Sequence, residues 1–246
     1  MERFGAVPCP PSGGVFTGYF STSIHVRDDL TVFNPEEEVF IFVDPGYTHY
    51  NAVEAAHVRN GRFYTFDEIY TTGLVTTDVI KVAEKRDWFR NVKRGSCDIA
   101  GTHHRPEGAP VVEQWRNATI NRPEGPIHLS SNRVLITEGI ERFKTKLMPH
   151  PITKEPDFYV NSKCKGLISE LGGRLNPVTG QANVWSWRMG DDKQIVGRNP
   201  EDRYNDACKA IIYGIVDMCG YANKLPFFNH PHIIRTISHE VAHAGY

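Results

Sequence analysis

The apolar run Val39–Val43 ends in Asp44 and is followed directly by Pro45-Gly46. A run this short, rich in β-branched and aromatic residues and stopped by Pro-Gly, is typical of a buried β-strand. A carboxylate at the tip of such a strand is held in a fixed position, where it can serve as a metal ligand or a general base. An Asp before Pro-Gly can also simply start a turn, so the role of Asp44 depends on its partners.

The pattern around this strand predicts a mixed α/β sheet covered by helices. Two further strands, at 52–58 and 62–70, are joined by Asn60-Gly61, a strong hairpin signal. The remaining elements expected are a possible short strand at 16–20, a helix at 76–93 and a strand at 96–100, helices at 109–119 and 131–148, a strand at 158–160, a helix at 163–171, a hairpin within 183–198 and a helix at 201–218.

Composition limits the class of protein. With 246 residues, 40% hydrophobic and 23% charged, the chain suits one large domain with appendages. No apolar stretch approaches the roughly 20 residues of a membrane span, so no membrane partner is expected. Five scattered cysteines without a Cys-x-x-Cys pair favour a reducing compartment over a disulfide scaffold or a cysteine zinc site. A net charge of −1 does not exclude nucleic acid, since acidic site residues can offset local basic patches.

Further acidic residues repeat the situation of Asp44. Asp98 ends a short predicted strand and is followed by small residues. Asp202 and Asp206 are four residues apart, so they would share one face of the late helix; capping of the helix start is an alternative role for Asp202. Such hard oxygen ligands suit Mg²⁺ or Mn²⁺. Two such ions about 4 Å apart can activate water and stabilise the leaving oxygen of a phosphodiester.

Four segments in this order resemble a known family. They are residues 42–48, 67–70, 97–101 and 199–207, and the first two aspartates are separated by 98 − 44 = 54 residues. The chain, from about residue 2 to about 219, resembles the nuclease domain of the phage large terminase subunit, a ribonuclease H-like domain. The resemblance implies a ribonuclease H-like mixed central sheet flanked by helices, with an accessory β-hairpin near 183–198.

The resemblance also implies the site. Asp44, Asp98 and Asp202 would be catalytic and bind the metals, and Asp206 would be a further ligand or brace the site. The family often has Asp-His at the third motif, whereas Arg203 stands here, and Glu201 adjoins Asp202. The choice among these acids therefore stays open.

Other residues are candidates for supporting roles. Glu68, on the strand next to that of Asp44, could close the site as an auxiliary acid, as could Glu201; an edge-strand surface charge is the alternative for Glu68. On the hairpin, Arg188, Lys193 and Arg198 could neutralise DNA phosphates, a contact without sequence information.

The expected function is metal-dependent hydrolysis of duplex, concatemeric DNA with low sequence specificity, in the cytoplasm of an infected bacterial host. The partners implied are double-stranded DNA, the terminase ATPase domain, the small terminase subunit and the portal protein. The sequence has no Gly-x-x-x-x-Gly-Lys-Ser/Thr loop, so the motor itself is not in it. The expected division is a lead-in from the motor domain at 1–37, the nuclease domain at 38–222 and a tail at 223–246.

Two rival classes remain open. Asp44, Gly46 and Thr48 also fit Asp-x-Gly-x-Thr, a phosphate loop of actin-like and sugar-kinase-like nucleotide-binding proteins, which need a second glycine-rich turn. The tail carries His-Glu-x-x-His, the zinc protease signature, at His239, Glu240 and His243. A third zinc ligand is expected downstream in such enzymes, and only residues 244–246 follow, so this is the least favoured class.

Overall fold

The computed structural model describes residues 13–103, 108–192 and 194–220. Its centre is a six-stranded mixed sheet. In spatial order the strands are β5 (His128–Ser130), β4 (Val92–Cys97), β1 (Val39–Asp44), β2 (Asn51–Arg59), β3 (Arg62–Thr71) and β6 (Phe158–Val160). The strand β1 pairs antiparallel with β2 and parallel with β4.

The predicted start of the sheet is confirmed. All six residues of β1 are buried, as expected of a strand covered on both faces. Asn60 and Gly61 have φ of 53° and 76°, so both turn residues take the left-handed conformation that a tight hairpin requires. The hairpin β2–β3 therefore follows from local chemistry.

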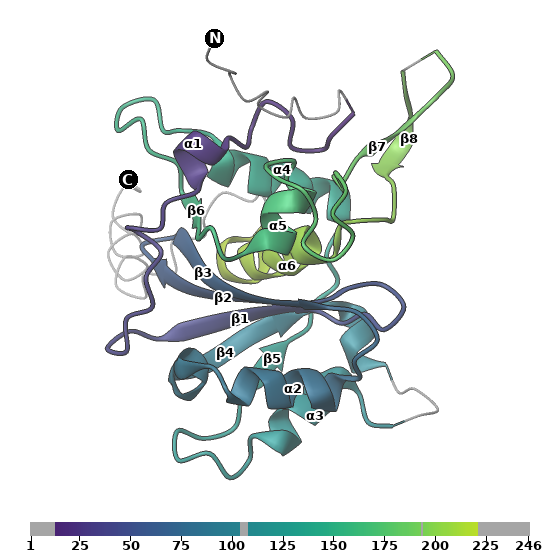
Figure 1. The fold of residues 1–246 in the computed structure, drawn as a ribbon. Helices are drawn as coiled ribbons and strands as arrows, with labels where there is room; N and C mark the ends of the chain where they lie inside the picture. Colours follow the sequence, from purple (N-terminus) through teal and green to yellow (C-terminus); the bar gives the residue numbers. More distant parts are fainter. Residues whose placement is uncertain (1–12, 104–107, 193, 221–246) are drawn as a thin grey trace, which may run out of the picture.

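Helices cover both faces of the sheet (Figure 1). On one face lie α4 (Ile136–Leu147), α5 (Lys165–Glu170) and α6 (Asp206–Cys219), and on the other lie α2 (Thr76–Glu84) and α3 (Val111–Ala118). The short α1 (Thr22–His25) packs near β6. None of the helices in the described ranges is long and apolar enough to cross a membrane.

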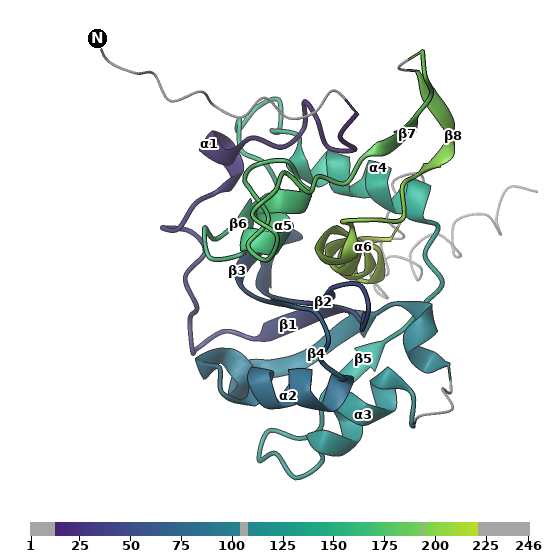
Figure 2. The ribbon, with the colours of Figure 1, turned by 45° about the vertical axis from the view of Figure 1, so that its right-hand side comes forward.

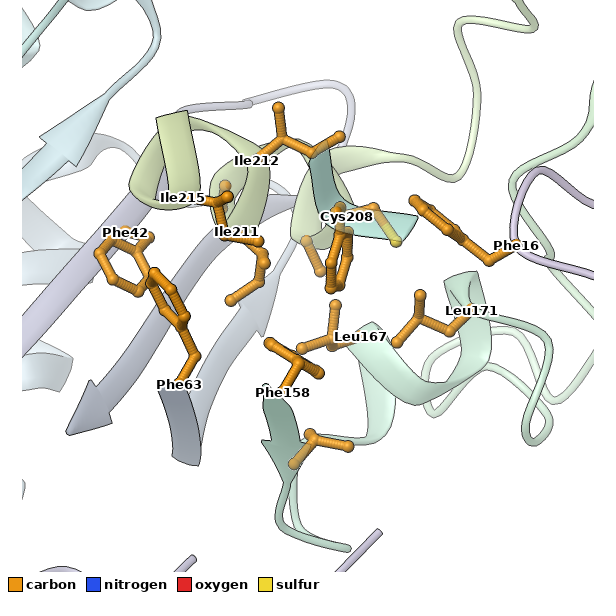
Figure 3. Packing of buried hydrophobic residues seen from close by; sticks show 14 of the residues in the cluster. Phe16, Phe42, Phe63, Phe158, Leu167, Leu171, Cys208, Ile211, Ile212 and Ile215 are labelled. Carbon is orange, nitrogen blue, oxygen red and sulfur yellow. The ribbon is translucent and has the colours of Figure 1, made fainter. Parts of the chain in front are cut away.

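The helix α6 lies directly on the sheet. Ile211 and Ile215 are fully buried in one cluster with Phe42 of β1 and Phe63 of β3 (Figure 3). Burial of each such side chain contributes about 1.5–3 kcal/mol. A Cβ added at Gly214 would meet the ring of Phe42, so glycine permits this close approach. The start of α6 is thereby held near the end of β1.

Several predicted boundaries were wrong. The helix expected at 76–93 ends at Glu84 and is followed by a 3₁₀ helix, Asp87–Asn91, because Trp88 and Phe89 are buried against the sheet. The strand expected at 96–100 is β4, Val92–Cys97, which ends just before Asp98.

Four more corrections concern residues 16–20, the elements β5 and α4, and the late helix. Residues 16–20 form turns rather than a strand, and Phe16 packs into the core. The strand β5 was not anticipated, and α4 starts at Ile136 instead of residue 131. The late helix starts at Asp206, not at residue 201, because β8 of the accessory hairpin continues to Pro200.

The accessory hairpin is present as predicted. It consists of β7 (Trp187–Met189) and β8 (Ile195–Pro200), paired antiparallel, and it projects beyond the helical layer (Figure 2). The predicted tail at 223–246, with its His-Glu-x-x-His sequence, lies outside the described residues, as does Lys193.

Candidate active site

Two acids leave the sheet side by side. Val43 of β1 is paired in parallel with Cys97 of β4, so the following residues, Asp44 and Asp98, emerge at the same edge. Asp44 is the last residue of β1 and is 8% exposed, whereas Asp98 is half-buried. The parallel register therefore brings together two acids that are 54 residues apart.

A third acid comes from the helical layer. Asp206 is the first residue of α6 and is 8% exposed. Burial raises the pKa of Asp206. The charges of Lys209 and His49 and a hydrogen bond from the Tyr50 backbone favour its ionised form, but burial outweighs them. The start of α6 thus places a carboxylate beside the end of β1.

Asp44 interacts electrostatically with the other two acids. Burial raises the pKa of Asp44 well above its usual value, and the charges of Asp206 and Asp98 raise it further. A buried carboxylate is costly to ionise unless a cation neutralises its charge.

The structure places Asp202 differently from the prediction. It lies in the turn before α6, so it does not share a helical face with Asp206. Its side chain is 81% exposed and accepts bonds from Lys209 Nζ at 2.6 Å and Asn205 Nδ2 at 3.1 Å. These bonds lower the pKa of Asp202. Asp206, rather than Asp202, is therefore the late acid among the charges that act most strongly on Asp44.

Lys209 was missed by the sequence reasoning. It lies one turn after Asp206 on α6, and its charge acts on both Asp44 and Asp206. The signal was present in the sequence, because residues three apart on a helix share a face. The lysine was overlooked because Asp202 was assigned to that face instead.

Glu170, at the end of α5, was also missed. It is fully buried and accepts bonds from the Cys208 amide at 2.8 Å and the Tyr70 hydroxyl at 2.9 Å. Burial, reinforced by the charge of Asp206, raises the pKa of Glu170 to about 8. Only the packing of α5 against α6 brings it here, so no local sequence signal existed.

The two auxiliary acids have other roles in the structure. The Glu68 carboxylate accepts the amides of Gly166 and Leu167 at 2.6 and 3.0 Å, which caps the start of α5. Glu201 is exposed, and its backbone joins the hairpin by accepting the Trp185 indole N–H at 2.8 Å. Neither carboxylate is among the charges that act most strongly on Asp44, which are those of Lys209, Asp206, Asp98 and Glu170.

The base of the hairpin borders Asp202 and Lys209. A hollow of about 430 Å³ lies between the start of α4 and the hairpin, and Arg188, Asp202 and Lys209 are among its lining residues. Arg188 and Arg198 are exposed on the two strands. Trp185 is buried in the core and Trp187 packs against the same cluster, with its ring centroid 5.7 Å from Lys144 Nζ, so both tryptophans serve packing.

The donor set fits a divalent cation such as Mg²⁺ or Mn²⁺, since it offers carboxylate oxygens and two of its acids, Asp44 and Asp206, are buried. The side chains do not yet form a metal site: within the described ranges no group of three or more His, Cys, Asp or Glu side chains is arranged to hold a metal. Three like charges repel one another, so a cation would have to draw the carboxylates together.

The nucleotide-binding alternative finds little support in this geometry. It needs a second glycine-rich phosphate turn, and the candidate segment after Asp98 is a 3₁₀ helix, Ile99–Thr102, in which Gly101 is buried. The zinc-site residues of the tail are outside the described residues.

The chain resembles known proteins in its fold. No family model matches the sequence, and no curated protein matches it either. The fold itself is that of the ribonuclease H-like nucleases, a mixed sheet flanked by helices. More particularly, it is the fold of the nuclease domains of phage large terminases.

Three solved structures illustrate the match. The nuclease domain of the P22 large terminase has a TM-score of 0.57 and 13% identity, over 85% of this chain and 94% of that one. The large terminase nuclease of thermophilic phage G20c, with bound magnesium, has a TM-score of 0.51 and 14% identity, over 84% and 98%. The large terminase of another thermophilic bacteriophage has a TM-score of 0.56 and 17% identity, over 84% of this chain and 45% of its own. This chain thus spans about 45% of that terminase.

Proposed function

We propose that this chain is the metal-dependent endonuclease domain of a DNA-packaging terminase, with Asp44, Asp98 and Asp206 as its metal ligands. The observation that supports the proposal is the parallel register that brings Asp44 and Asp98 to one edge of the sheet, with the charge of Asp206 acting on Asp44, on the fold of terminase nuclease domains. The G20c nuclease, on the same fold, is described with magnesium and with cobalt bound.

The acids would bind the metal ions, and the arginines of the hairpin would contact the DNA. Asp44 is fixed by β1 and Asp206 by the start of α6, so each presents its carboxylate from a rigid element. Two bound Mg²⁺ or Mn²⁺ ions would activate water and stabilise the leaving oxygen of the phosphodiester. Arg188 and Arg198 would contact phosphates, which positions the duplex without reading its sequence.

The wider setting is part of the proposal. The substrate would be concatemeric double-stranded DNA, and the ATPase domain, small terminase subunit and portal protein would be partners in the cytoplasm of an infected bacterial host. Residues 1–37 would lead in from the ATPase domain, 38–222 would form the nuclease and 223–246 its tail.

Single amide substitutions test the assignment. Asp44→Asn, Asp98→Asn and Asp206→Asn should each abolish Mn²⁺-dependent plasmid cleavage while circular dichroism remains that of the folded protein. The matched control is Asp87→Asn, an exposed acid on the far face of the sheet, which should cleave normally. Asp202→Asn at saturating Mn²⁺ should retain activity. Full activity in Asp206→Asn combined with its loss in Asp202→Asn would restore Asp202 as the third ligand.

A further inference from the structure

Lys209 stands between two sets of acids. Its Nζ lies 2.6 Å from Oδ1 of Asp202, which is 81% exposed, while the lysine side chain itself is only 20% exposed. Asp206, which is 8% exposed, lies one helical turn before Lys209 on α6, and α6 packs on β1, the strand that ends in Asp44. The ammonium group is thus held at the rim of the candidate metal site by an acid that is not part of it.

A lysine is suited to this position. Its charge sits on a flexible four-carbon stem, so the ammonium can change partner without any movement of the helix. Asp206 and Lys209 are three apart on α6, which keeps the stem on the face that carries Asp206. The alternatives open to the ammonium are the exposed carboxylate of Asp202 and the buried acids.

The two alternatives have opposite consequences for a divalent cation. An ammonium turned toward Asp44 and Asp206 would occupy the charge position of a metal and repel it. An ammonium held by Asp202 leaves the buried acids to the metal, although its charge remains near. Like charges repel strongly where water is partly excluded, so the position of the ammonium bears directly on metal affinity.

We propose that Lys209 and Asp202 form a latch that sets the metal affinity of the site: Lys209 competes with the metal for the buried acids, and Asp202 holds Lys209 aside. The latch rests on the proposed function, because it presupposes that the acids bind a cation. Asp202 is then a positioning residue that acts through Lys209 and not a ligand.

The test measures Mn²⁺ affinity without DNA, by isothermal titration and by electron paramagnetic resonance of free Mn²⁺. Lys209→Met removes the charge and keeps the length of the stem, and should bind Mn²⁺ about five- to tenfold more tightly. Asp202→Asn frees the lysine and should bind about threefold more weakly. The double variant should match Lys209→Met, because Asp202 has nothing left to hold.

A matched control is available on α2. Lys81 and Asp78 form an exposed pair with a separation of 2.9 Å, three residues apart and on the opposite face of the sheet. Lys81→Met and Asp78→Asn should leave Mn²⁺ affinity within twofold of the unmodified chain. Lys209→Gln serves as a second neutral variant should the methionine disturb folding, which thermal unfolding will show.

The outcomes separate the latch from the proposed function. Unchanged or weaker Mn²⁺ binding in both neutral Lys209 variants overturns the latch alone. Equal weakening by Asp202→Asn with and without Lys209→Met also overturns it, since Asp202 would then be a ligand. Absence of Mn²⁺ binding in every variant overturns both the latch and the metal-dependent function.

Discussion

The carboxylate of Glu170 accepts the backbone amide of Cys208 at 2.8 Å, two residues after Asp206. The same carboxylate accepts the Tyr70 hydroxyl at 2.9 Å, and the Tyr70 ring stacks on Tyr50 with centroids 4.1 Å apart. Glu170 therefore ties the start of α6 to the sheet and to the loop that follows β1. The position of Asp206 depends on this contact.

Removal of Glu170 should damage both stability and the site. Glu170→Ala leaves a buried amide without its acceptor and opens a cavity, so the free energy of unfolding should fall by about 2–4 kcal/mol. Because its pKa of about 8 leaves Glu170 largely neutral at pH 7, Glu170→Gln should cost only about 1 kcal/mol. Urea unfolding measures both. Glu141→Ala, at an exposed position on α4, is the control. If Glu170→Ala lowers the free energy of unfolding no more than this control, Glu170 does not stabilise the start of α6.

Glu54 should make the free energy of unfolding depend on pH. It is fully buried on β2, neither carboxylate oxygen has a hydrogen-bond partner in the described residues, and burial raises its pKa well above 4.5. The folded state thus binds this proton more tightly than the unfolded state. The stability it gives is complete below the unfolded pKa and is lost as pH rises through the folded pKa.

An apolar replacement should remove that loss. Glu54→Leu is expected to raise the free energy of unfolding by about 1–3 kcal/mol at pH 8 and to flatten its fall between pH 5 and 8. Urea unfolding at a series of pH values gives both quantities. Glu84→Leu, at the exposed end of α2, is the control and should leave the slope unchanged. If the unfolding free energy of Glu54→Leu falls with pH as steeply as that of the unmodified chain, Glu54 is not the cause of the fall.

Asp44 should lower the stability of the metal-free fold and bind the metal. Asp44 is buried, and the charges of Asp206 and Asp98 act on it, so its ionised form is unfavourable to the metal-free fold. Asp44→Asn should raise the unfolding free energy by about 1–2 kcal/mol in the presence of a chelator. Added Mn²⁺ should raise the melting temperature of the unmodified chain but not of the variant. A similar Mn²⁺ shift in both proteins would remove Asp44 from the ligand set.

The sequence predicted those parts that local chemistry determines. The strand before Asp44 and the turn at Asn60-Gly61 were found because buried strands and tight turns have strong local patterns. The strand before Asp98 was misplaced because Lys93 and Arg94 look like the end of a helix. Its pairing with β1 comes from residues far away in the sequence, which no local pattern contains.

The candidate site was predicted only in part for the same reason. Asp202 and Asp206 both suit a helix start by composition. The choice between them depends on how far β8 extends, since that strand runs to Pro200 and Asn205 becomes the residue before the helix. Glu170 meets α6 only through packing of α5, so its role could be found in three dimensions alone.

The accessory hairpin offers the last prediction, on DNA affinity. Arg188 and Arg198 are exposed on β7 and β8, beside the hollow that leads to Lys209. If each contacts one phosphate, the double variant Arg188→Glu with Arg198→Glu should weaken duplex binding at least about tenfold at low salt and reduce the salt-dependence slope by about 2. Fluorescence anisotropy with unrelated duplexes in Ca²⁺ measures both, and the loss should be equal for every sequence. Arg116→Glu, exposed on α3 across the sheet, is the control; if it weakens binding as much as the double variant, the effect is one of net charge and the hairpin is not the contact.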